Sequence, residues 1–169
     1  NLLDGLLKYA QAGTIHSPVE KINFPDLVNT VAHEVEAAND FNICCEHCAF
    51  TVEAEKKPLH EVIYELVDNS VKHHHLQKGH IQVGVVEQND YYEFFVADDG
   101  PGIELVYQDR IFQLFQTLQP RDIVESCGVG LSIAKKIIEA QGGSICVKSD
   151  KNQGSVFHFT WPKQMGGVV

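Results

Sequence analysis

The stretch PLHEVIYELVDNSVKHH, residues 58–74, carries the clearest structural signal in the chain. Its apolar residues recur every three or four positions: Leu59, Val62, Ile63, Leu66, Val67 and Val71. This period places them on one face of an α-helix. The pattern therefore predicts a helix over 58–74 that buries one face against another layer of the protein.

Short strands and helices are predicted on both sides of this helix. Asn23 is placed to cap a helix that has Pro25 in its first turn. The strands are expected at 20–24, 41–52, 81–86, 91–97, 144–149 and 155–161, and the other helices at 1–10, 24–38 and 129–140. This order predicts an α+β fold, a two-layer α/β sandwich with the helices on one face of a mixed, mostly antiparallel sheet.

The composition excludes several classes of function. The 169 residues include 13 Lys+Arg and 23 Asp+Glu, a formal net charge of −10. Such a chain is not expected to bind nucleic acid through phosphate contacts or to adhere to an anionic membrane surface. No apolar run approaches the roughly 20 residues that span a bilayer. The 5 Cys show no disulfide spacing, which favours reduced thiols and a cytoplasmic location.

The polar face of the 58–74 helix offers two interpretations. Glu65, Asn69 and Lys72 lie four and three residues apart, and so share one side. An amide oxygen and substrate phosphates could together hold Mg²⁺, with Lys72 meeting the phosphate charge. The alternative, favoured by periodicity alone, is a solvated face whose Glu65 and Lys72 are too far apart to pair.

Two glycine-containing segments allow close approach of a ligand to the backbone. Asp98-Asp99-Gly100-Pro101-Gly102-Ile103 follows a strand, and an ionised Asp98 could accept a hydrogen bond from an exocyclic amine such as that of adenine. Cys127-Gly128-Val129-Gly130-Leu131-Ser132 opens a helix, where backbone N–H groups can bind an anion. Taken singly, each segment could equally be an ordinary turn or helix entry.

Together, these segments resemble the ATP-binding catalytic domain of sensor histidine kinases, in the gyrase, histidine kinase and mismatch-repair ATPase superfamily. The resemblance covers nearly the whole chain and implies a Bergerat-type ATP-binding fold. In chain order, the matching segments resemble the N box (65–74), the first glycine box (98–103), the F box (110–115), the second glycine box (128–133) and the closing box (154–157).

The resemblance implies a role for each matching residue in binding ATP or ADP. Asn69 would hold Mg²⁺, and Lys72 with His73 would contact the phosphates. Asp98 would bind the adenine amine. The residues that would complete the pocket are Gly100, Gly102, Ile103, Gly128, Val129, Gly130 and Leu131.

The acid and the lid are also implied by the resemblance. Glu65 would be a general base for water in an ATPase, or would orient Mg²⁺-bound water in a kinase. Residues 104–127 would form the ATP lid, anchored by Phe112 and Phe115, with Arg121 as a candidate phosphate contact. The resemblance of 115–122 to a kinase lid favours the second role for Glu65.

The leading segment favours a kinase as well. Residues 1–13 resemble the end of the second helix of a dimerisation and phosphoacceptor domain, 14–163 the catalytic domain, and 164–169 a tail. We expect transfer of the γ-phosphoryl group of Mg-ATP to a His on a dimerisation domain that this chain lacks. The full protein is expected to be a homodimer that passes the phosphate to a response regulator receiver domain. A segment outside this chain could anchor it to a membrane.

Two alternatives remain at this point. One is an ATP-gated conformational ATPase of the same superfamily. The other is a non-catalytic interaction module, which Ser126 and Cys127 in the second glycine box would favour. Clusters at Cys44-Cys45-Glu46-His47-Cys48 and His73-His74-His75 are more consistent with ordinary strand and helix-end residues than with a metal site.

Overall fold

The computed structural model describes residues 2–35, 40–46, 50–116 and 128–164. Its main sheet has five strands in the order β2-β4-β5-β7-β6. They are β2 (Phe41–Cys45), β4 (Gly79–Glu87), β5 (Tyr91–Asp98), β7 (Ser155–Pro162) and β6 (Ile145–Ser149). Only the β2–β4 pair is parallel. The predicted mixed, mostly antiparallel sheet is therefore confirmed.

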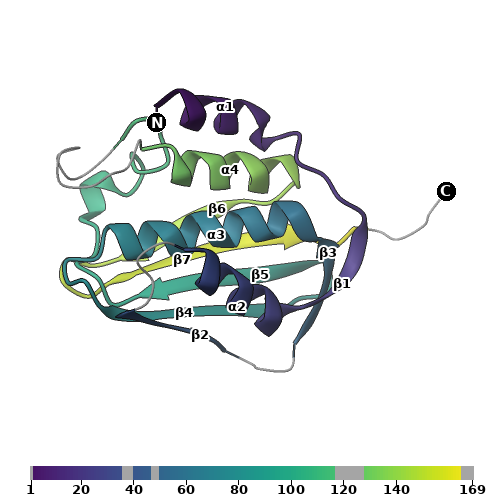
Figure 1. Ribbon diagram of the computed structural model, residues 1–169, viewed down its shortest axis with the longest axis horizontal. Helices are drawn as coiled ribbons and strands as arrows, with labels where there is room; N and C mark the ends of the chain where they lie inside the picture. The colour runs from purple at the N-terminus through teal and green to yellow at the C-terminus, as the bar shows by residue number, and fades with distance from the viewer. Residues whose placement is uncertain (1, 36–39, 47–49, 117–127, 165–169) are drawn as a thin grey trace.

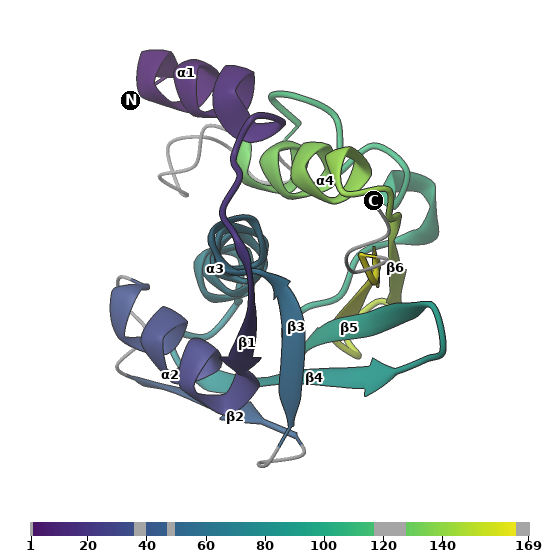
Figure 2. The same cartoon turned by 90° about the vertical axis from the view of Figure 1, so that its right-hand side faces the viewer.

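Three helices form the second layer. They are α2 (Phe24–Glu34), α3 (Lys56–Lys72) and α4 (Gly130–Ala140), and they lie on the same face of the sheet (Figures 1 and 2). The leading helix α1 (Leu2–Ala12) lies on α4 and not on the sheet, so it adds a further tier above the sandwich (Figure 2). A second sheet pairs β1 (Val19–Asn23) with β3 (Thr51–Glu55).

The core lies between the sheet and α3. All six residues of the apolar stripe on α3 are buried. From the sheet, β7 contributes Phe157, Phe159 and Trp161, none more than 2% exposed. Phe159 stacks on Phe94 of β5 with ring centroids 4.9 Å apart. The apolar side chains of α3 and β7 thus pack together in one layer, and this packing holds α3 across the sheet.

The start of α2 follows the sequence signal. The side-chain oxygen of Asn23 accepts a hydrogen bond from the Asp26 N–H at 3.1 Å, and Pro25 lies in the first turn. The helix ends at Glu34. It is therefore shorter than the expected 24–38, and residues 36–39 lie outside the described part of the chain.

The segment expected to be extended at 41–52 forms parts of two strands, and residues 47–49 lie outside the described part of the chain. This segment contributes β2 to the edge of the main sheet and the start of β3 to the second sheet. β2 pairs with β4, whereas β3 pairs with β1, which precedes both in the sequence. The sequence of residues 41–52 does not itself show which distant strand each part of the segment will pair with. None of the helices in the described part is long and apolar enough to cross a membrane.

Candidate functional site

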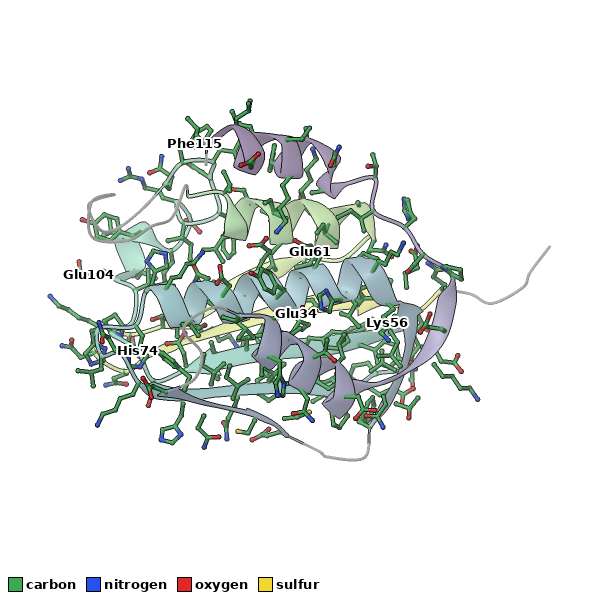
Figure 3. All side chains as sticks on the ribbon, in the orientation of Figure 1. Glu34, Lys56, Glu61, His74, Glu104 and Phe115 are labelled. Carbon is green, nitrogen blue, oxygen red and sulfur yellow. The ribbon has the colours of Figure 1, made fainter. Side chains whose placement is uncertain are left out.

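The polar residues singled out by the sequence gather at one end of the molecule. In Figure 3, Lys56 marks the beginning of α3 and His74 its other end. The C-terminal half of α3, the end of β5 and the beginning of α4 meet on the His74 side (Figures 1 and 3). The candidate site is therefore built from three elements that are far apart in the sequence.

Asp98, at the end of β5, is held by two hydrogen bonds. Its Oδ1 accepts from the Gly100 N–H at 2.9 Å, and its Oδ2 accepts from the Ser70 hydroxyl of α3 at 3.2 Å. Burial raises the pKa of this carboxyl above its usual range, although both hydrogen bonds favour the charged form. Asp98 thus presents a fixed acceptor at the junction of β5 and α3.

The turn after Asp98 requires glycine for steric reasons. Gly102 has φ +75°, and an added Cβ there would lie 2.0 Å from the Asp150 carbonyl oxygen. At Gly100, an added Cβ would approach Asp98 Oδ1 at 2.9 Å. The next residue, Ile103, is half-buried and donates its N–H to Ser149 Oγ at 2.7 Å. The turn is therefore packed against the β6–β7 hairpin.

Asn69, Lys72 and His73 lie at the end of α3. The half-buried Asn69 side chain has no hydrogen-bond partner among the residues that the structure describes. Lys72 Nζ lies 2.9 Å from Asp68 Oδ2. Burial, and next the charge of Lys72, lower the pKa of His73, which favours its neutral form. The end of the helix thus offers an amide oxygen that no described residue occupies, beside an ammonium group.

Glu65 is buried, which corrects the expectation of a solvated face. Its side chain is 7% exposed, and Lys8 Nζ of α1 lies 2.6 Å from its Oε1. Burial raises the pKa of Glu65 to about 7, although Lys8 opposes the shift. The cation that pairs with Glu65 comes from α1, at a separation of 57 residues, and not from Lys72.

At the beginning of α4, the backbone lies very close to neighbouring residues. Gly128 has φ +69°, and its carbonyl oxygen accepts a hydrogen bond from the Phe115 N–H at 2.8 Å. An added Cβ at Gly130 would lie 2.7 Å from Glu65 Oε2. Val129 is buried and Leu131 half-buried. The four residues at 128–131 thus bring the backbone at the start of α4 close to the acid of α3.

Of the predicted lid at 104–127, the structure describes residues 104–116. Its first part contains η2 (Leu105–Tyr107), and Phe112 then packs edge-on against Phe157 at 6.2 Å between ring centroids. The Phe112 carbonyl accepts from Ser132 Oγ of α4 at 2.9 Å, and Phe115 also contacts the core. Phe112 and Phe115 thus pack against the core, as expected of residues that would anchor a lid. Arg121, Ser126 and Cys127 lie outside the described residues.

A supporting layer beneath the site was not predicted. His74 has a side chain only 2% exposed, and its Nε2 lies 2.8 Å from Asp99 Oδ1. Asp99 also accepts from the His80 N–H at 3.0 Å. Ser70 and Asp68 were missed as well, although Asp68 lies four residues before Lys72, the spacing of a helical ion pair. Within 2–35, 40–46, 50–116 and 128–164, no cluster of His, Cys, Asp and Glu is arranged to hold a metal ion.

Comparison with known proteins identifies relatives of this chain. The sequence profile of the "Histidine kinase-, DNA gyrase B-, and HSP90-like ATPase" family matches residues 54–165. Cyanobacterial phytochrome A of Nostoc sp. is 38% identical over 112 residues, 66% of this chain and 15% of that protein. Phytochrome-like protein Cph1 of Synechocystis sp. is 31% identical over 163 residues, 95% of this chain and 22% of that protein. The chain thus spans less than a quarter of the length of these two relatives.

Solved structures share the fold. The catalytic domain of histidine kinase ThkA has a TM-score of 0.71 and 26% identity, with 87% of this chain and 97% of that chain covered. Full-length ShkA in complex with AMPPNP has a TM-score of 0.78 and 24% identity, with 95% of this chain and 35% of that chain covered. The α/β sandwich described above is the fold of histidine kinase catalytic domains.

Proposed function

The chain belongs to the histidine kinase-, DNA gyrase B- and HSP90-like ATPase family, and on that basis we propose that it is the ATP-binding catalytic domain of a two-component sensor histidine kinase. The observation that carries the proposal is the fixed Asp98 carboxylate at the end of β5, facing a glycine turn. A carboxylate held in this way can accept the adenine amine without reorganising.

The adenine end of the nucleotide would lie against this turn. Asp98 would accept the amine, and Gly100 and Gly102 would allow the ring to approach the backbone. Ile103, half-buried on the adjoining loop, would supply apolar contact. The hydrogen bonds from Ser70 and Gly100 support the proposal because they fix the direction of the Asp98 oxygens.

The phosphate end would lie between α3 and α4. The donor set fits Mg²⁺, because Asn69 offers an amide oxygen that no described residue occupies and Glu65 lies one helical turn before it. The ion would neutralise phosphate charge. Lys72 and His73 would contact the phosphates from α3, and the backbone of Gly128, Val129, Gly130 and Leu131 would do so from α4. Arg121 is proposed as a further phosphate contact from the lid.

The proposed reaction moves the γ-phosphoryl group to a His imidazole on a dimerisation domain. This chain would contribute positioning and charge neutralisation, which is the main work of a protein in phosphoryl transfer. Glu65 would orient water around the ion. In this scheme, residues 1–13 end the dimerisation helix, 14–163 form the catalytic domain with a lid at 104–127, and 164–169 are a tail.

The proposed partners follow from the same scheme. They are a second copy of the full-length protein and the receiver domain of a response regulator. ThkA, whose fold this chain shares at a TM-score of 0.69 and 24% identity, has been solved in complex with response regulator protein TrrA. That complex supports a response regulator as the partner proposed here.

One observation favours the ATPase alternative. Burial raises the pKa of Glu65 to about 7, which suits a general base acting near neutral pH. Slow ATP hydrolysis by the isolated chain, lost in Glu65→Gln, would support this reading. Phosphotransfer to an added phosphoacceptor domain, without hydrolysis, would support the kinase.

Calorimetric titration with ADP tests the adenine site. The unaltered chain should bind ADP, and Asp98→Asn should weaken binding at least tenfold, since it replaces a charged acceptor by an amide. Asp90→Asn is the matched control. Asp90 is exposed in the turn between β4 and β5, at the other end of β5 from Asp98, so the affinity of this variant for ADP should be unchanged. Equal affinities for Asp98→Asn and the unaltered chain, or no binding by folded protein, would refute the proposal.

A further inference from the structure

The leading helix α1 reaches the candidate site through one side chain. Lys8 Nζ lies 2.6 Å from Glu61 Oε1 and 2.6 Å from Glu65 Oε1, both on α3. The Lys8 side chain is 42% exposed, whereas Glu61 and Glu65 are 20% and 7% exposed. In Figure 3, Glu61 lies on the side of α3 that faces α4 and α1. A partly exposed cation on α1 thus pairs with two largely buried carboxylates on α3.

A second lysine also holds α1 in place, but this lysine lies on α4 and its contacts are on α1. Lys136 of α4 donates to the Tyr9 carbonyl at 3.0 Å, and its Nζ lies 4.4 Å from the centre of the Tyr9 ring. Ala12, at the end of α1, is buried. The contact through Lys8 is therefore part of a packed arrangement of α1 on the domain, although α1 lies outside the residues that match the family profile.

The surroundings of Glu65 make Lys8 its direct cationic partner. From α3, it is faced by Glu61, Tyr64 and Lys72, and Lys72 is itself paired with Asp68 at 2.9 Å. From α4, the backbone of Gly130 lies against Oε2 of Glu65. A buried carboxylate without a cation is costly, so removing Lys8 would leave the acid free to turn away or bind a proton.

We propose that Lys8 is a positioning residue of the phosphate site: by binding Glu61 and Glu65 together, it holds Glu65 against Gly130 and makes the docking of α1 a condition for the site to use Mg²⁺. The inference rests on the proposed function, in which Glu65 orients water around the ion. A movement of α1 would then displace the Lys8 ammonium group and, with it, the Glu65 carboxylate.

The test compares ATP affinity with Mg²⁺ and with EDTA by calorimetry. Lys8→Met should reduce the gain in affinity that Mg²⁺ gives by about tenfold, the effect of losing one charge-assisted hydrogen bond. Its affinity for ADP in EDTA should be unchanged, because Asp98 and its turn are separate from Lys8. Lys8→Arg should restore the gain. Lys135→Met is the matched control, because it removes a half-exposed lysine of α4 whose one ion pair with a described residue is with Glu139 at 3.8 Å.

A Glu65→Gln background separates positioning from general destabilisation. There, Lys8→Met should have no further effect on the gain from Mg²⁺. Should Lys8→Met not fold, Lys8→Gln gives the same comparison. An equal gain in Lys8→Met and the unaltered chain, or an equal loss in the Glu65→Gln background, overturns the inference alone. No nucleotide binding by the folded, unaltered chain overturns the proposed function and this inference with it.

Discussion

Gly130→Ala should destabilise the domain, although alanine is the better helix former. The added Cβ would lie 2.7 Å from Glu65 Oε2. To reach an ordinary C···O separation of about 3.3 Å, the carboxylate must move by roughly half an ångström. Glu65 is 7% exposed and bound to Lys8 at 2.6 Å, so this movement disturbs a charge-assisted hydrogen bond in a covered position.

The magnitude follows from two opposing contributions. Disturbing a hydrogen bond to a charged group costs about 1.5–3 kcal/mol. Replacing glycine by alanine in a helix returns at most about 1 kcal/mol, and less at the first turn, where Gly130 lies. We therefore expect Gly130→Ala to lower the free energy of unfolding by about 1–2 kcal/mol.

A double-mutant cycle with Glu65→Ala isolates the clash. With the carboxylate removed, Gly130→Ala should be neutral or stabilise by up to about 1 kcal/mol, so the coupling free energy should be about 2 kcal/mol. Urea unfolding followed by circular dichroism measures each variant. Gly13→Ala is the control, because its Cβ would meet Lys136 Cε at an ordinary 3.5 Å. A coupling below about 0.5 kcal/mol would refute the steric reasoning.

Three further predictions concern the cap, the core and a titrating residue. Asn23→Ala removes the cap of α2 and should lower the free energy of unfolding by about 1 kcal/mol; an unchanged urea midpoint would contradict this. Trp161→Ala empties a fully buried position and should cost about 3–5 kcal/mol, so a loss below about 1 kcal/mol would contradict tight packing there. The pKa of His73 is lowered from 6.5, so the native state binds fewer protons than the unfolded chain, and the stability contributed by His73 is lost as pH falls below 6.5. His73→Gln should therefore lose less stability between pH 7.5 and 5.5 than the unaltered chain, as measured by urea unfolding; an equal loss would argue against a half-buried, neutral His73.

Much of the fold could be predicted because its signals are local. The apolar period over 58–74 and the alternation of Phe157, Phe159 and Trp161 each reflect one element facing one core, and both are confirmed by burial. The division of 41–52 between two sheets could not be predicted, because β2 and β3 differ in their distant partners, β4 and β1. The pairing depends on which distant strand lies beside each one in the folded chain, and neither strand's own sequence specifies this.

The sequence by itself determined the order of the elements, the helical face that carries Glu65, Asn69 and Lys72, and the positions of the two glycine segments at 98–103 and 128–133. Backbone periodicity and glycine's conformational freedom act over a few residues, so a linear reading captures them. Only the tertiary structure decided which of these polar groups are buried and what pairs with them. Glu65 is enclosed because α1 and α4 pack over a face of α3 that looks solvent-exposed from its own sequence, and its cation, Lys8, arrives from 57 residues away.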